Sequence, residues 1–181
     1  PEQKMTARYV LGMDLGTTNS VVAYAPLSAE KLAIQLLPIP QLVDSGTIES
    51  LSSLPSFLYL GREEEAAAGS LDLAWAAGRA FCIGQFARRQ AAEVPDRTVG
   101  AAKSWLCHSR IDRHQPVLPW NAPDDVPKVS PVTASQRYLE HLVDAWEAAF
   151  PDARVMGDAV RGGRIVDATQ DAYGQAFVFE P

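Results

Sequence analysis

A short turn between two apolar runs constrains the fold of this chain more than any other feature. Residues 12–20 read Gly-Met-Asp-Leu-Gly-Thr-Thr-Asn-Ser, preceded by Tyr-Val-Leu and followed by Val-Val-Ala-Tyr. Two apolar runs that flank glycine and polar residues predict a β-hairpin over residues 8–25. Gly16 lets the backbone approach another group closely, and Thr17 and Thr18 offer hydroxyls and amide N–H groups. The sequence therefore predicts a turn that can hold an anion.

The acidic residue before this turn points to the same chemistry. Asp14 lies too near a bound phosphate to contact it favourably by itself, but its carboxylate suits Mg²⁺, which takes oxygen ligands and keeps several waters. For an isolated Asp-x-Gly, a plain hairpin that uses glycine for its geometry is the simpler interpretation. The full Gly-x-Asp-x-Gly-Thr-Thr pattern between two strands favours phosphate and magnesium binding.

The turn resembles the first phosphate motif of the actin-like ATPase superfamily, in the form carried by the seventy-kilodalton heat-shock chaperones (the DnaK type). Two later stretches are similar to the same family. Residues 54–60 read Leu-Pro-Ser-Phe-Leu-Tyr-Leu; residues 83–90 read Ile-Gly-Gln-Phe-Ala-Arg-Arg-Gln, with Thr-Val-Gly-Ala-Ala-Lys at 98–103. The resemblance implies an α/β fold: a ribonuclease-H-like first lobe with a mixed sheet and flanking helices.

The same resemblance assigns roles to single residues. The expected ligands of the ATP or ADP phosphates are Gly16, Thr17, Thr18 and Asn19. Asp14 would organise Mg²⁺ through water, and Lys103 would stabilise charge near the γ-phosphate and orient water, so these two are the expected catalytic residues. Without the resemblance, Lys103 would be taken as a solvated surface lysine.

The resemblance covers residues 8–150, which we expect to form a partial actin-like ATPase domain. Within it, the proline-rich segment 115–131 is expected to be a surface loop or linker and not a core element. A long amphipathic helix should follow, capped by Thr133 or Ser135, running to Phe150 and burying Trp146. Residues 151–181 form a tail that does not match the family, and only residues 175–179 in it are typical of a strand.

The family's ATPase domain has two lobes, and this chain can supply only the first. The sequence carries neither a second phosphate motif, nor an adenosine-binding glycine motif, nor a substrate-binding domain. Hydrolysis needs groups on both sides of the γ-phosphate, so we expect a fragment or truncated product that binds ATP weakly and hydrolyses it poorly. Unfolded clients and co-chaperones are expected only for a full-length form. A sugar-kinase-like relative and a non-catalytic interaction module remain alternatives.

Charge and hydropathy limit the other partners. The net charge of −6 argues against nucleic acid, whose phosphates favour a basic face. No apolar run approaches the roughly 18 residues of a membrane span, so we expect no membrane partner. The N-terminal residues lack the apolar core of a signal peptide, and two cysteines give no disulfide framework, so a cytoplasmic location is expected.

Overall fold

The computed structural model describes residues 8–28 and 33–152 of the chain. The expected strand at 175–179, and the tail beyond Asp152, lie outside the described residues. The first sheet is built around the predicted hairpin, in the strand order β1-β2-β3 with β6 paired to the start of β2. Its strands are β1 (Tyr9–Leu15), β2 (Asn19–Pro26), β3 (Gln35–Leu36) and β6 (Leu54–Pro55).

Two further sheets complete the strands of the described residues. The second is the hairpin of β4 (Ile39–Asp44) and β5 (Thr47–Leu51). In the third, β7 (Phe57–Leu60) lies between β8 (Phe81–Ile83) and β9 (Thr98–Gly100). The helices are α1 (Glu63–Ala67), α2 (Gln85–Glu93), the 3₁₀ turn η1 (Pro95–Arg97), α3 (Ala102–Trp105) and α4 (Pro131–Ala149).

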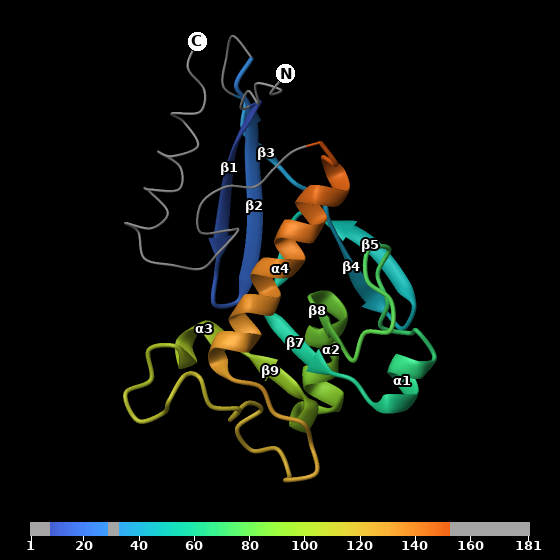
Figure 1. Ribbon diagram of the computed structural model, residues 1–181, viewed down its shortest axis with the longest axis vertical. Coiled ribbons are helices and arrows are strands. Elements are labelled where there is room, and N and C mark those ends of the chain that lie inside the picture. Colours follow the sequence, from blue (N-terminus) through green and yellow to red (C-terminus); the bar gives the residue numbers. More distant parts are fainter. Residues whose placement is uncertain (1–7, 29–32, 153–181) are drawn as a thin grey trace, which may run out of the picture.

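The long helix α4 packs against all three sheets and joins them into one core (Figure 1). Near its C-terminal end, the Trp146 ring meets those of Tyr9 and Tyr24 edge-on, with centroids 5.8 and 5.5 Å away. In its middle, the ring of His141 lies 2.9 Å from the carbonyl oxygen of Pro40 on β4. Near its start, the Tyr138 hydroxyl approaches the Val99 carbonyl of β9 at 3.5 Å. Burial of these aromatic rings supplies much of the apolar contact that stabilises the fold.

The α/β class expected from the sequence is what the structure shows, but the expectation of one mixed sheet is wrong for the described residues. Their strands form three sheets, and every pairing between them is antiparallel. For two of these pairs the reason lies in the connection. β1 and β2, like β4 and β5, are joined by tight turns, which allow only antiparallel pairing because parallel neighbours need long crossovers.

The proline-rich segment 115–131 was expected to lie outside the core, and this expectation is wrong because some of its residues contribute to the core. Leu118 and Val129 are only 2% and 8% exposed, and their backbones exchange two hydrogen bonds of 2.9 and 2.8 Å. Trp120 is 53% exposed but stacks on Trp105 of α3, with centroids 5.4 Å apart. The prolines exclude regular structure, yet the apolar residues between them still reach the core.

The start of α4 differs from the sequence expectation as well. Its cap is Ser130, whose hydroxyl oxygen accepts a hydrogen bond from the Thr133 N–H at 3.0 Å, and Pro131 occupies the first helical position. Proline is favoured there because its missing N–H would have no partner in the helix. The predicted burial of Trp146 is confirmed, since it is 2% exposed.

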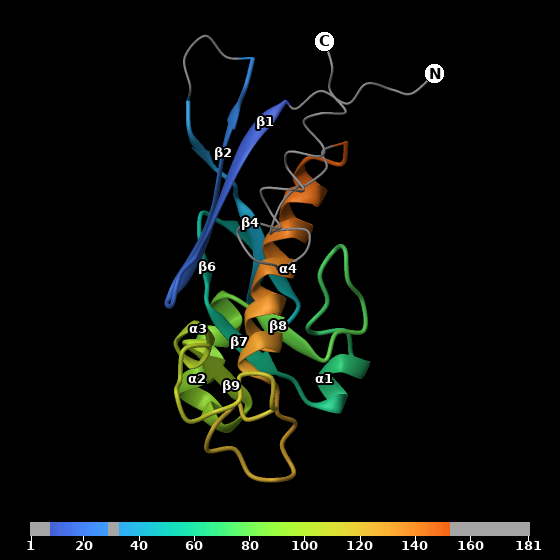
Figure 2. The same ribbon diagram turned by 60° about the vertical axis from the view of Figure 1, so that its left-hand side comes forward.

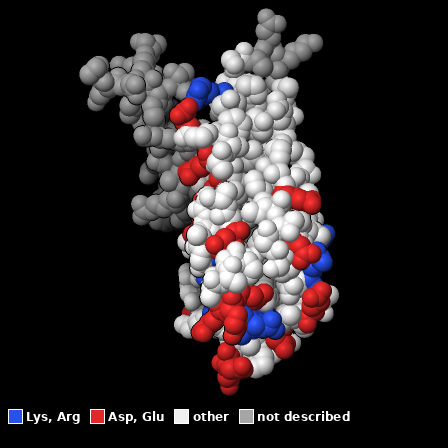
Figure 3. Space-filling view, turned by 90° about the vertical axis from the view of Figure 1, so that its right-hand side faces the viewer, with Lys and Arg blue, Asp and Glu red and all other residues white. Residues whose placement is uncertain are grey.

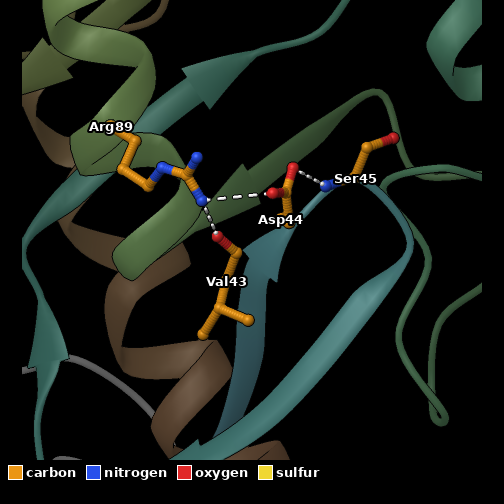
Figure 4. Close-up of polar contacts among 4 residues, drawn as sticks. All are labelled: Val43, Asp44, Ser45 and Arg89. Carbon is orange, nitrogen blue, oxygen red and sulfur yellow. Dashed lines mark hydrogen bonds and ion pairs between the residues drawn. The ribbon is translucent and has the colours of Figure 1, made fainter.

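An exposed ion pair ties the β4–β5 turn to helix α2 (Figure 4). The guanidinium of Arg89 donates to the Val43 carbonyl at 2.8 Å and lies 3.3 Å from the Asp44 carboxylate. The Ser45 N–H also donates to Asp44, at 2.8 Å. This amide and then the guanidinium hold the pKa of Asp44 below its ordinary value. Since both side chains are exposed, the pair positions the turn more than it stabilises the protein.

Candidate phosphate-binding turn

The predicted hairpin is confirmed, and its turn is residues 16–19. The last cross-strand pair before the turn joins Leu15 to Ser20, and Asp14 pairs with Val21. At Gly16, an added Cβ would overlap the carbonyl oxygen of Asn19, which folds back over the turn. Only glycine fits this position, so the tight course of the backbone is encoded by Gly16 itself.

The polar groups of the turn face outward. Thr17, Thr18 and Asn19 are all exposed. Within the described part of the chain, the amides and hydroxyls of Thr17 and Thr18 donate no hydrogen bond to another residue. Asp14 is exposed on the outer face of β1, opposite the face that packs on α4. The turn therefore presents unused donors with a carboxylate close behind them in sequence, which is the arrangement that an anion and its counter-cation require.

Ser56 lies under the turn and holds it from the protein side. Its N–H donates to the Thr18 carbonyl at 2.9 Å, and its hydroxyl donates to the Gly16 carbonyl at 2.8 Å. The hydroxyl of Ser20 lies 3.0 Å from that of Ser56. Both serines are buried, at 0% and 1% exposure. Strand β6 brings them together by pairing with the start of β2, where Asn19 faces Pro55.

Sequence reasoning assigned no role to Ser20 or Ser56. The signal was present in residues 54–60, where a serine stands inside an otherwise apolar run. A polar side chain in such a run is buried, and a buried hydroxyl takes a hydrogen-bond partner. The partner could not be inferred, because residues 16 and 56 are far apart in sequence and meet only through the β2–β6 pairing.

Helix α3, which carries Lys103, lies beside the tip of the β1–β2 hairpin in both views (Figures 1 and 2). Lys103 is exposed there, and among the described residues no hydrogen bond or ion pair joins it to the turn. The residue before the helix, Ala101, has φ 51°, a left-handed conformation that costs an L-residue roughly 1–2 kcal/mol. The structure thus places helix α3 and the tip of the hairpin side by side.

The Ile-Gly-Gln stretch at residues 83–85 has a structural role between β8 and α2. Gly84 has φ +100°, and a Cβ there would overlap the side chains of Gln41 and Leu54. Gln41 is fully buried; its amide donates to the Ser53 carbonyl at 2.9 Å, and its oxygen accepts from the Gln85 N–H at 2.9 Å. Both polar groups of the Gln41 side chain are therefore used by the protein itself.

Among the described residues, no group of three or more His, Cys, Asp or Glu side chains is arranged to hold a metal ion. The magnesium role expected for Asp14 therefore stays a prediction that depends on phosphate oxygens and water as further ligands. Cys82 is buried and Cys107 exposed, and neither is in a disulfide.

Two ionisable groups with strongly shifted pKa values, His141 and Cys82, lie in packing interfaces. Burial lowers the pKa of His141 to about 4 and raises that of Cys82 to about 12. The Pro40 carbonyl can only accept, so the Nε2 atom of His141 carries the proton of the neutral ring. His141 therefore has a structural role, as a contact between α4 and β4.

The face that carries α1 is predominantly acidic in its lower half (Figure 3). The first turn of α1 alone contributes Glu63, Glu64 and Glu65. Acidic side chains stabilise the N-terminal end of a helix through its dipole, so a local structural reason accounts for them.

In the described part of the chain, no helix is both long enough and apolar enough to cross a membrane.

Comparison with known proteins gives no independent assignment. No family model matches the chain, and no curated protein matches it. The turn, its supports and the residues beside it are therefore the basis for assigning a function.

Proposed function

We propose that this chain binds the phosphates of a nucleotide and Mg²⁺ through residues 14–19, as the first lobe of a heat-shock-type actin-like ATPase domain. The observation that carries the proposal is the turn itself. Glycine closes it at Gly16, its threonine donors face outward, and buried Ser56 fixes it from below. Backbone amides fixed in this way can bind an anion without reorganising when it arrives.

The chemistry follows from the groups that the turn presents. The amides and hydroxyls of Thr17 and Thr18 suit the oxygens of a β- or γ-phosphate, and Asn19 extends the same edge. Asp14 suits a water-coordinated magnesium ion that neutralises those phosphates. Lys103 on α3, the helix beside the hairpin tip, would stabilise the charge that develops during phosphoryl transfer.

The proposal extends to the fold and to the setting. Under it, the three antiparallel sheets and α4 are part of a ribonuclease-H-like lobe, and hydrolysis needs groups beyond this lobe because one lobe covers only one side of the γ-phosphate. ATP or ADP is the expected ligand, and clients and co-chaperones belong to a longer form. A sugar-kinase-like relative would share residues 14–18 but would not account for Lys103. The free cysteines favour a cytoplasmic location.

Calorimetric titration with Mg-ATP tests the proposal. We expect saturable binding that Asp14→Ala weakens strongly, because the variant removes the only carboxylate of the 14–19 segment. Asp124→Ala is the matched control: it removes another exposed carboxylate, from the proline-rich segment, and should bind as the unchanged chain does. Absence of binding by a folded chain, or equal binding by the Asp14 variant, would overturn the proposal.

A second candidate, a non-catalytic interaction module, is favoured by the outer face of the first sheet. Val10 and Leu36 point outward on β1 and β3 and are 49% and 52% exposed. They share that face because Val10 pairs with Ala25 and Leu36 with Ala23, two positions apart on β2. Exposed apolar side chains on one face favour self-association. Light scattering of the unchanged chain and of Val10→Lys would detect it, and a monodisperse monomer would contradict it.

A further inference from the structure

Ser56 contacts the turn at two carbonyl groups simultaneously. Its amide N–H donates to the Thr18 carbonyl at 2.9 Å and its hydroxyl to the Gly16 carbonyl at 2.8 Å. Ser56 is only 1% exposed, so water competes poorly for either bond. One residue therefore fixes two of the peptide units that form the turn.

The direction of the hydroxyl bonds follows from proton counting. A carbonyl oxygen only accepts, so the single proton of the Ser56 hydroxyl is used on Gly16. In the 3.0 Å contact between the two serine hydroxyls, Ser20 must then be the donor. The chain of bonds runs from Ser20 to Ser56 to the Gly16 carbonyl. Such chains strengthen each member by polarisation, and Ser20, with no exposed surface, is fixed in place.

Fixing a carbonyl also fixes the N–H of the same peptide unit. In a trans peptide the C=O and N–H bonds point in opposite directions, and the only cis peptide among the described residues is Leu118–Pro119. The Gly16 carbonyl shares its peptide unit with the Thr17 N–H, and the Thr18 carbonyl shares its unit with the Asn19 N–H. When Ser56 draws both carbonyls toward itself, both N–H groups point away from it.

We propose that Ser56 is a positioning residue of the phosphate turn, which aims the N–H groups of Thr17 and Asn19 at a bound polyphosphate. The Ser56 hydroxyl, which Ser20 holds in place, orients the Thr17 N–H. The backbone amide of Ser56 orients the Asn19 N–H. The inference rests on the proposed function, since a nucleotide polyphosphate is the ligand. Ser56 does not touch that ligand and acts only through the turn.

Side-chain substitutions separate the two bonds, because they leave the backbone amide of Ser56 in place. In titrations with Mg-ATP and with Mg-tripolyphosphate, Ser56→Ala should weaken binding of both about tenfold, the size of one lost hydrogen bond. Ser56→Thr keeps a hydroxyl and should restore affinity, while Ser20→Ala should weaken binding less than Ser56→Ala. Circular dichroism and urea unfolding show whether each variant is folded. A folded Ser56→Ala that is less stable but binds with unchanged affinity would overturn the inference.

Amide signals in nuclear magnetic resonance test the geometry without nucleotide. Ser56→Ala should shift the Thr17 N–H signal and speed its exchange with solvent, and should leave the Asn19 signal nearly unchanged. An unaltered Thr17 signal would overturn the inference whether or not nucleotide binds. If the Thr17 signal responds but the unchanged chain binds neither probe, the positioning by Ser56 stands and the proposed function fails.

Discussion

Gly16 and Gly84 occupy opposite surroundings, although at both positions an added Cβ would overlap an oxygen atom. At the β8–α2 junction, Gly84 meets Gln41, whose amide donates to Ser53 and accepts from Gln85, so both polar groups of that side chain are used. At the hairpin turn, Gly16 lies among exposed residues, and the threonine donors beside it are unused. The same residue type therefore serves stability at one position and leaves room for a ligand at the other.

The largest effect should come from Gly84→Ala. The alanine must adopt φ +100° and displace Gln41 and Leu54, so we expect a loss of about 3 kcal/mol or more in the free energy of unfolding. Gly46→Ala is the matched control, because Gly46 also has positive φ (+65°) but no atom lies within 4 Å of its Cβ position. Urea unfolding should show a loss of only about 1 kcal/mol for the control. Equal losses in both variants would show that contacts at Gly84 contribute nothing.

The next largest effect should be a loss of stability in acid, caused by the protonation of His141. Burial lowers its pKa from 6.5 to about 4 in the folded protein, so between these values the unfolded chain binds a proton that the folded chain does not. Stability should therefore fall as the pH drops from about 6.5 to 4, by at most about 3 kcal/mol, and this contribution is fully retained above pH 6.5.

The control for this pH dependence is His141→Gln, whose amide can still donate to the Pro40 carbonyl but does not titrate. Unfolding free energies measured between pH 4 and 7 should fall more steeply for the unchanged chain than for the variant. The comparison between the two cancels the carboxylates, including Asp144, whose pKa burial raises. Parallel curves for the two proteins would contradict the assignment.

The sequence predicted those elements whose signals are local. The hairpin and its turn and the buried face of α4 with Trp146 followed from apolar periodicity and from glycine and proline. Strand β5 was missed because its residues are mostly exposed and lack the alternation typical of a half-buried strand. The buried Leu118 and Val129 were missed because proline spacing predicts the backbone and not the packing of the residues between.

The candidate site likewise has a part that the sequence predicted and a part that it did not. Asp14 and residues 16–19 are adjacent in sequence, so their pattern was sufficient to predict a turn with outward donors, and the role of those donors stays a prediction. The support from Ser20 and Ser56 depends on the β2–β6 pairing, which joins segments 36 residues apart in sequence. Local patterns carry no information about such a partner, although an isolated serine in an apolar run indicates that one is needed.

Gly16→Ala should cost less stability than Gly84→Ala but should abolish ligand binding. Its Cβ would overlap the backbone carbonyl oxygen of Asn19, so the turn backbone must shift, and we expect a stability loss of about 2 kcal/mol, less than at Gly84 because the turn lies at the surface. The shift would break the 2.8 Å bond between Ser56 and the Gly16 carbonyl, and Mg-ATP binding should be lost. Urea unfolding and calorimetry on the same sample measure both effects. A variant that binds Mg-ATP with unchanged affinity would remove the turn from the proposed site.

The smallest effect on stability is expected at Ala101, the residue that precedes helix α3 and Lys103. Ala101→Gly relieves the left-handed strain at φ 51° next to Lys103, and the gain is partly offset by the greater backbone freedom of glycine in the unfolded chain. We expect a net stabilisation of about 0.5 kcal/mol, measured as a rise in the urea midpoint with unchanged slope.

Because Ala101 directly precedes α3, the variant also tests whether the strained alanine holds Lys103 in place. Steady-state ATP hydrolysis that falls while Mg-ATP affinity stays constant would indicate that it does, and stability and hydrolysis both unchanged would show that φ 51° carries no strain at this position.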